Sequence, residues 1–150
     1  MYKLNTNMNV TPSAADNPPA TRAVINIRNL RLRTYIGFNP EEIEKQQDVV
    51  INIEIAYAVA ESALRDQVAD ALDYKVITKQ VIRHVEEGRF LLLERLVADV
   101  LAICSAHPSI RSAQVTIEKP HALRFADSVA LTLHYRADQS NHLRLLEKAS

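Results

Sequence analysis

Four short segments of the chain carry side chains that could transfer protons or hold an anion. In chain order they are the acidic loop Glu41, Glu42 and Glu44, Tyr74 beside Asp73, Glu94 within LLLERL, and Lys119 followed by His121 and Arg124. Carboxylates accept paired hydrogen bonds, lysine and tyrosine transfer protons, and arginine grips phosphate. Each segment also has an ordinary structural explanation, such as a solvated loop or a side chain packing a helical turn. Residue types and spacing alone therefore leave the function open.

Metal and cofactor chemistry is not indicated. None of the five histidines stands in a zinc-binding helix motif, and the single cysteine, Cys104, has no second cysteine with which to form a zinc site or a disulfide. Only two glycines occur, which excludes a P-loop and a dinucleotide-binding loop. We expect a reaction without metal or cofactor, and we expect Cys104 to be a small buried hydrophobe on a helix.

Composition predicts one cytoplasmic domain with a real core. The chain has 150 residues, of which 47% are hydrophobic, and its 18 basic residues equal its 18 acidic ones. This balance gives no reason to expect a nucleic-acid or membrane partner. The N-terminal stretch lacks the apolar centre of a signal peptide, and no apolar run approaches the roughly 20 residues that span a bilayer.

The periodicity of apolar residues predicts the order strand, strand, helix, helix, strand, strand. Alternation marks strands at residues 24–36, 49–59, 113–118 and 129–136, and a phase shift in the first predicts a bulge near Arg28 and Asn29. Helical stripes follow Asp73 as far as Gly88, and run from Leu93 to Cys104. We expect an α+β fold, a four-stranded antiparallel sheet with both helices on one face.

The predicted domain spans residues 22–137, between a disordered N-terminal arm at 1–21 and a C-terminal tail at 138–150. The arm carries Pro12, Pro18 and Pro19 among asparagine, serine, threonine and alanine, and it has too little apolar surface to order itself. Four strands leave two sheet edges exposed, and such edges invite pairing with another chain.

The motifs together resemble the dihydroneopterin aldolase and epimerase family of the tunnelling fold. The segments that carry the resemblance are LRLRTYIGFNPEEIEKQQDVVINIEI, ALDYKVITK, HVEEGRFLLLERL and TIEKPHALRFADSV, which span about residues 23 to 136. The variants KPHALRFADSV and LRLRT are similar to the triphosphate epimerase branch. The resemblance implies a homo-oligomeric barrel, commonly an octamer, with active sites between neighbouring subunits and no cofactor.

The resemblance also implies roles for individual residues. Lys119 is similar to the general base, Glu94 to the carboxylate that anchors the pterin, and Tyr74 to a tyrosine supplied by the adjacent subunit; we group Glu42 with Lys119 and Tyr74 as catalytic. Further positions that match contacts to the pterin are Leu93, Leu72 and Gln47. A triphosphate needs cations, for which the nearest candidates are His121 and Arg124, with Arg31 and Arg33 behind them.

The expected activity is that of an isomerase. It inverts C2' of 7,8-dihydroneopterin triphosphate by retro-aldol and aldol steps, to give dihydromonapterin triphosphate. Two alternatives remain open. One is an aldolase that releases glycolaldehyde and 6-hydroxymethyl-dihydropterin from dihydroneopterin, and the other is a non-catalytic oligomer that binds pterins.

Overall fold

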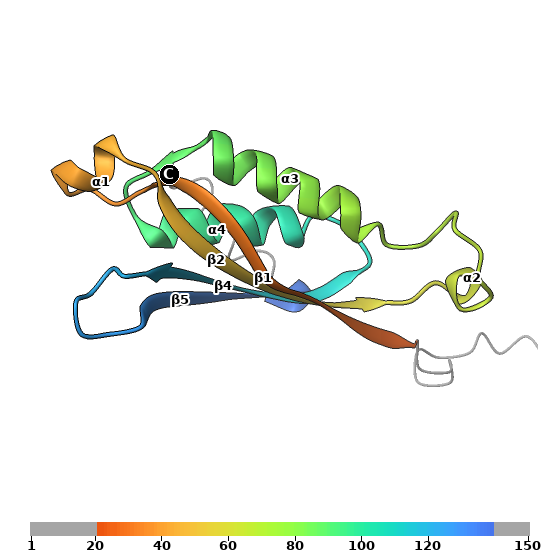
Figure 1. The fold of residues 1–150 in the computed structure, drawn as a ribbon. Helices are drawn as coiled ribbons and strands as arrows, with labels where there is room; N and C mark the ends of the chain where they lie inside the picture. The colour runs from red at the N-terminus through yellow and green to blue at the C-terminus, as the bar shows by residue number, and fades with distance from the viewer. Residues whose placement is uncertain (1–20, 140–150) are drawn as a thin grey trace, which may run out of the picture.

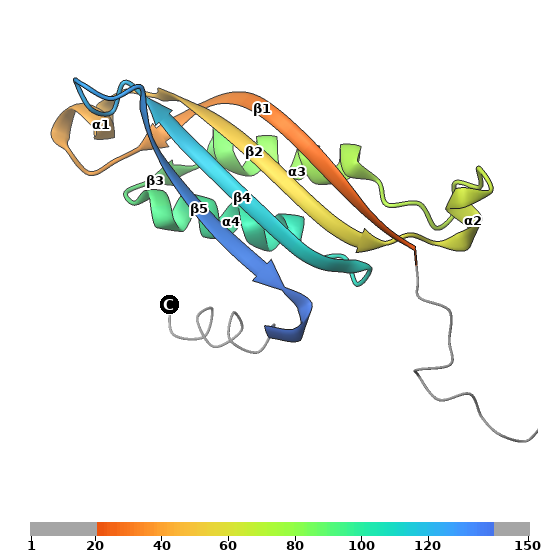
Figure 2. The same cartoon turned by 90° about the horizontal axis from the view of Figure 1, so that it is seen from below.

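The computed structural model describes residues 21 to 139, so the expected N-terminal arm and C-terminal tail lie almost entirely outside the described residues. Four long strands form the sheet and two helices cover one of its faces (Figures 1 and 2). The strands are β1 (Arg22–Ile36), β2 (Gln47–Ala58), β4 (Ile110–Pro120) and β5 (Ser128–Arg136), and the helices are α3 (Tyr74–Glu87) and α4 (Leu93–Cys104). The predicted fold class is confirmed.

Short elements that the sequence patterns did not reveal complete the fold. They are α1 (Pro40–Glu44), α2 (Glu61–Leu64), β3 (Arg89–Phe90) and the 3-10 turn η2 (Ala137–Gln139). The sheet order is β3-β1-β2-β4-β5, with β3 parallel to β1 and the long strands antiparallel. The expected polar connection between β1 and β2 therefore contains a helical turn, and the sheet gains a two-residue fifth strand.

Strict alternation in β2 builds the middle of the core. Val49, Ile51, Ile53 and Ile55 are at most 2% exposed and face the helices together with apolar residues of β4. Helix α3 contributes Ile77, Val81 and Val85 to this core. From α4 come Leu96, Val97, Val100, Leu101 and Cys104. Burial raises the pKa of the Cys104 thiol to about 12, as suits a small apolar side chain in a helix.

The predicted bulge in β1 is confirmed. Ile27 pairs with Ile53 and Leu30 pairs with Ile51, so β1 has one residue more than β2 between the two pairs. Asn29 takes a positive φ of 54°, and its N–H donates to Oδ1 of Asn52 at 3.0 Å. The extra residue returns Leu30 and every second position after it to the core face.

Predicted helix boundaries also agree with the structure. The carboxylate of Asp73 accepts hydrogen bonds from the N–H groups of Lys75 and Val76 and so caps α3, and Gly88 ends the helix with a bond to the carbonyl of Val85. Within the described residues, no helix is long and apolar enough to cross a membrane.

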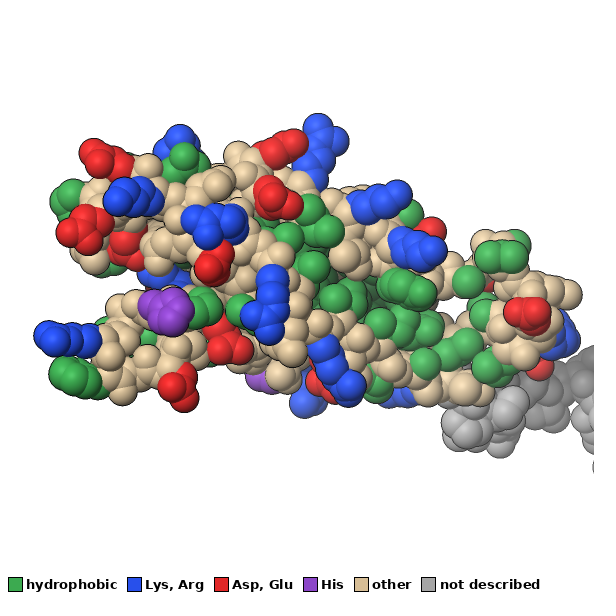
Figure 3. Space-filling view, in the orientation of Figure 1, with side chains coloured by type: hydrophobic (Ala, Val, Ile, Leu, Met, Phe, Trp, Pro, Cys, Tyr) green, Lys and Arg blue, Asp and Glu red, His purple; other side chains and the backbone are tan. Residues whose placement is uncertain are grey.

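The antiparallel pairing gives the sheet two distinct ends. At one end β2 begins and β4 finishes beside α1, and at the other β2 finishes and β4 begins beside α2 (Figure 1). We call these the α1 end and the α2 end. Among the described strands, β5 has a free edge, and so does the part of β1 that β3 does not cover. Apolar side chains gather between α3 and the sheet (Figure 3), which is consistent with the expected association of subunits.

Candidate active site

A cluster of three polar side chains lies at the α1 end. Nζ of Lys119 is 2.6 Å from Oε2 of Glu42, and Nε2 of Gln47 donates to the same oxygen at 2.9 Å. The same Gln47 nitrogen also donates to the carbonyl of Ile36 at 2.6 Å. The Lys119 and Glu42 side chains are only 14% and 19% exposed. The structure thus joins three of the residues singled out in the sequence.

Local structure explains how distant residues meet here. Glu42 lies on α1, directly after the chain leaves β1, and Gln47 begins β2. Lys119 follows Val115 and Ile117 on the inward face of β4, and it stands at the strand end, where its long side chain reaches α1. The ion pair therefore connects residues 77 positions apart in the chain.

The charge of Glu42 is stabilised by its partners. The hydrogen bond from Lys119 lowers the pKa of the Glu42 carboxyl below its ordinary 4.5, and bonds from Gln47 and the backbone act in the same direction, against the opposing effect of burial. A carboxyl whose pKa is lowered on folding stabilises the fold at pH values above 4.5. That contribution is lost as the pH falls through the lowered pKa.

This linkage predicts a pH-dependent effect of Glu42→Gln. Near neutral pH the substitution should reduce the free energy of unfolding by about 2 kcal/mol, because a charge-assisted bond to a largely buried lysine is lost. The difference between the two proteins should shrink on acidification to about pH 3. Chemical denaturation at fixed protein concentration measures it. A difference that is the same at both pH values would contradict the ion pair.

The start of α4 lies at the same end of the sheet. The N–H of Gly37 donates to the carbonyl of Phe90 at 2.9 Å, which ties the end of β1 to β3 just before α4 begins. Glu94 stands exposed in the first turn of α4, and Leu93 is partly buried against the core. A ligand at the α1 end can therefore meet the Glu94 carboxylate from solvent.

Tyr74 and Leu72 lie elsewhere in the chain. Leu72 lines a small hollow of about 80 Å³ at the α2 end with Tyr57 and Ser109. Tyr74 begins α3 two residues later and is 50% exposed. Between the levels of Lys119 and Tyr57, β2 runs for about eight residues, or roughly 25 Å. One chain therefore does not bring Tyr74 and Lys119 together.

The candidate phosphate-binding residues have different surroundings. His121 and Arg124 are exposed in the loop between β4 and β5, where Arg124 lies 5.5 Å from the ring centre of Phe125. Arg33 instead donates to Oδ1 of Asp48 at 2.7 Å and to the carbonyl of Gln46. Arg33 is thus committed to a surface ion pair, which leaves the loop cations as the better candidates.

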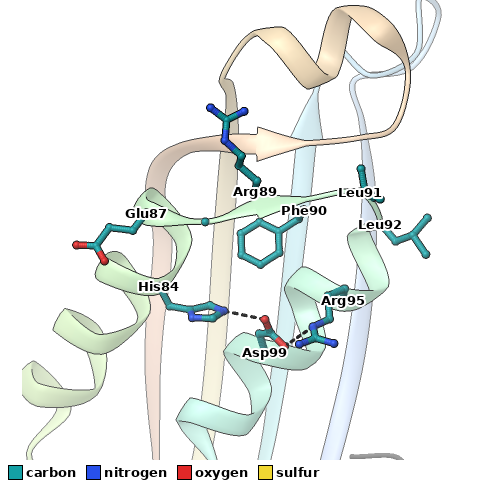
Figure 4. A pocket seen from close by; sticks show the side chains of 9 residues that line it. His84, Glu87, Arg89, Phe90, Leu91, Leu92, Arg95 and Asp99 are labelled. Carbon is teal, nitrogen blue, oxygen red and sulfur yellow. Dashed lines mark hydrogen bonds and ion pairs between the residues drawn. The ribbon is translucent and has the colours of Figure 1, made fainter. Parts of the chain in front are cut away.

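A hollow of about 770 Å³ in the described chain contains none of the predicted site residues (Figure 4). It lies where α3 ends and α4 begins. Asp99 joins His84 at 2.7 Å and Arg95 at 2.9 Å there. We do not assign a reaction to this hollow, because Asp99, His84 and Arg95 at its wall are already paired with one another. No group of three or more potential metal ligands occurs among residues 21–139.

Comparison with known proteins identifies the family to which the chain belongs. A family model described as dihydroneopterin aldolase (FolB) matches residues 25–134. The chain belongs to the dihydroneopterin aldolase family. This membership confirms the prediction made from the four motif segments, and the matched region runs from within β1 to within β5.

Individual relatives refine the placement within the dihydroneopterin aldolase family. The chain is 50% identical over 111 residues to a dihydroneopterin triphosphate 2'-epimerase of Pseudomonas aeruginosa, which covers 74% of this chain and 90% of that protein. It is 49% identical over 114 residues to the epimerase of Escherichia coli K12, with 76% and 95% covered. The crystal structure of E. coli dihydroneopterin aldolase in complex with neopterin matches with a TM-score of 0.70 at 31% identity, covering 75% and 98% of the two chains.

Sequence reasoning missed two features of this site. It gave Gln47 a contact with the substrate and did not predict that the amide nitrogen also binds Glu42 and the end of β1. It also gave Gly37 no role beyond a place in the loop. The scarcity of glycine was an available signal, because a chain with only two glycines keeps them where other residues fit poorly.

Proposed function

We propose that this protein epimerises C2' of 7,8-dihydroneopterin triphosphate. The observation that carries the proposal is the largely buried Lys119–Glu42 pair in a chain about half identical to two triphosphate epimerases and 31% identical to the aldolase of known structure. A pair that can accept a proton, at the end of the sheet where Glu94 is proposed to bind the pterin, suits a retro-aldol reaction.

Pterin recognition is assigned to the start of α4. The exposed carboxylate of Glu94 can accept two parallel hydrogen bonds, from the pterin amino group and from a ring N–H. The backbone of Leu93 supports the ring edge, and that of Leu72 is provided by a neighbouring subunit. Because the Gln47 amide nitrogen is engaged within the chain, only its carbonyl oxygen is left to accept a bond from the ligand.

The reaction begins with loss of the 2'-hydroxyl proton. Lys119 first passes an ammonium proton to Glu42, whose oxygen is 2.6 Å away. The neutral amine of Lys119 then accepts the hydroxyl proton through a water molecule, so the pair gains one proton overall. The C1'–C2' bond then breaks, and its electron pair moves into the pterin C=N bond at N5. The products are an enol-like pterin and a glycolaldehyde fragment that still bears the triphosphate.

The fate of the fragment decides the product. If the aldehyde turns over and adds again to C1', the reversed steps return the proton and C2' is inverted. If the aldehyde leaves and the enol is protonated at C1', the outcome is cleavage. Tyr74 of a neighbouring subunit moves a proton to or from C1'. One deprotonation thus serves both reactions, and retention of the fragment favours epimerisation.

The proposed assembly is a homo-octamer with sites between neighbouring subunits. The free sheet edges among the described residues and the separation of Tyr74 from Lys119 support this arrangement. The runner-up function is the aldolase acting on unphosphorylated dihydroneopterin, supported by the family model and the neopterin-bound relative. A non-catalytic pterin-binding ring is the third alternative.

The decisive experiment incubates the purified protein with dihydroneopterin triphosphate and, separately, with dihydroneopterin, and separates the products by chromatography. Conversion of the triphosphate to its 2' epimer, faster than any cleavage of the unphosphorylated compound, supports the proposal. Cleavage without epimer establishes the aldolase instead. Binding of both compounds without turnover would establish the non-catalytic alternative.

Arg124→Ala should separate phosphate recognition from bond breaking. The Arg124 guanidinium is exposed on the loop beyond Lys119, so its loss should raise KM for the triphosphate substrate about 10-fold or more and barely change turnover of dihydroneopterin. Escape of the fragment should increase, which raises the ratio of cleavage to epimer. Arg111→Ala, an exposed arginine of β4 at the α2 end, is the matched control. Equal damage to both substrates would assign Arg124 to the fold.

A further inference from the structure

Gly37 lies directly beneath the Glu42 carboxylate. A Cβ atom built on Gly37 would be 2.1 Å from Cδ of Glu42 and 2.3 Å from each of its carboxylate oxygens. These separations are far below the 3.0 Å that real Cβ atoms keep. Only glycine leaves the space in which this carboxylate sits.

The backbone of Gly37 also adopts a conformation reserved for glycine. Its φ is +125°, a region that L side chains rarely enter, and its N–H donates to the carbonyl of Phe90 at 2.9 Å. The turn therefore does two things at once. It ties β1 to β3, just ahead of α4, and it brings a bare backbone against Glu42.

The Glu42 carboxylate has little freedom to yield. Oε2 is held by Lys119 at 2.6 Å and by Gln47 at 2.9 Å, and the side chain is only 19% exposed. A methyl group at position 37 would push the carboxylate away from both partners, because the flexible end of a side chain moves more readily than the backbone. The expected consequence is a broken acid–base pair, in addition to the backbone strain that alanine meets at a φ of +125°.

We infer that Gly37 is a positioning residue. Because it has no side chain, the Glu42 carboxylate can occupy the space next to it and stay in contact with Lys119. The inference rests on the proposed function for its catalytic consequence, but the geometric claim stands without it. Gly37 does not touch the substrate in this scheme. It acts through Glu42, in a cluster where a displacement of about 1 Å can cost 100-fold in rate.

Gly37→Ala is the direct test. It should lower kcat for the triphosphate substrate about 100-fold and leave KM within about twofold, because the pterin anchor at Glu94 is untouched. In a Glu42→Ala background, where the space is vacant, only the backbone strain remains, so the same substitution should change kcat far less than it does with Glu42 present. An equal loss in both backgrounds would show that Gly37 acts through the backbone, and would overturn the inference.

Gly88→Ala is the matched control. It makes the same chemical change, and its Cβ would meet the Phe90 ring at 2.5 Å and the His84 carbonyl at 2.8 Å instead of a site carboxylate. This variant should lose stability, and its effect on kcat should be the same with and without Glu42. A coupling to Glu42 as large as that of Gly37→Ala would contradict a specific role for position 37.

A measurement independent of activity separates this inference from the proposed function. Carbon-detected NMR of the labelled carboxyl groups reports the titration of Glu42 in the assembled protein. In Gly37→Ala the pKa of Glu42 should rise towards its ordinary 4.5, because the bonds from Lys119 and Gln47 are lost. An unchanged titration would overturn the inference even if epimerisation is demonstrated. A rise would support it even if the substrate proves to be different.

Discussion

Lys119→Ala is expected to abolish both epimerisation of the triphosphate and any cleavage of dihydroneopterin. In the proposed mechanism the two reactions share the first deprotonation, and Lys119 is the amine in contact with Glu42 at the α1 end. Removal of a positioned acid–base group typically costs 100- to 10,000-fold in rate, so both activities should fall by about 100-fold or more. Because the loss is common to two substrates, it differs in kind from the selective effect expected of Arg124→Ala.

Control variants distinguish the loss of a catalytic group at position 119 from a loss of stability. Lys119→Ala leaves the Glu42 carboxylate largely buried without its cation, which lowers stability. Lys119→Gln keeps an N–H donor for Glu42 and should fold better while remaining inactive. Lys45→Ala changes an exposed lysine that follows α1 and should retain activity. A folded Lys119→Gln variant with more than about a tenth of normal activity would remove Lys119 from the mechanism.

The regular part of the fold could be predicted because its signals are local. Alternation in residues 49–59 and the phase shift around Asn29 follow from the two-residue period of a strand, and the structure confirms both. Asp73 and Gly88 bound α3 because capping depends on residues a few positions apart. The two-residue β3 and the single turn of α1 are too short for a period of apolar residues to show.

The site could be predicted only in part, for a related reason. The resemblance marked Glu42 and Lys119 separately, but their contact joins residues 77 positions apart and depends on the sheet register. The engagement of Gln47 with Ile36, and of Arg33 with Asp48, is equally a property of the folded chain. These contacts within the protein therefore could not be predicted from the sequence.

The distance between the two ends of the sheet predicts an active site that is shared between two subunits. Lys119 and Glu42 lie at the α1 end, whereas Tyr74 lies at the α2 end, with roughly 25 Å of β2 between the two levels. If a site needs both ends, it must join two subunits. Lys119→Ala and Tyr74→Phe subunits should each be nearly inactive alone, because every site lacks one group.

Mixed oligomers of these two variants should regain activity. When equal amounts associate at random, about one interface in four joins an intact Lys119 to an intact Tyr74, so about a quarter of wild-type activity should return. Co-expression with two different affinity tags isolates such oligomers, and steady-state kinetics measures them. Activity no higher than that of the separate variants would exclude Tyr74 from a shared site.

A second mixture makes the result specific. Lys119 and Glu42 touch within one chain, so a mixture of Lys119→Ala and Glu42→Ala subunits has no interface at which the pair is intact. These oligomers should stay inactive, although they assemble in the same way. Recovery in the first mixture without recovery in the second requires that the pair come from one subunit and the tyrosine from another. Recovery in both would mean that association itself repairs the variants, and the division of the site between subunits would then be wrong.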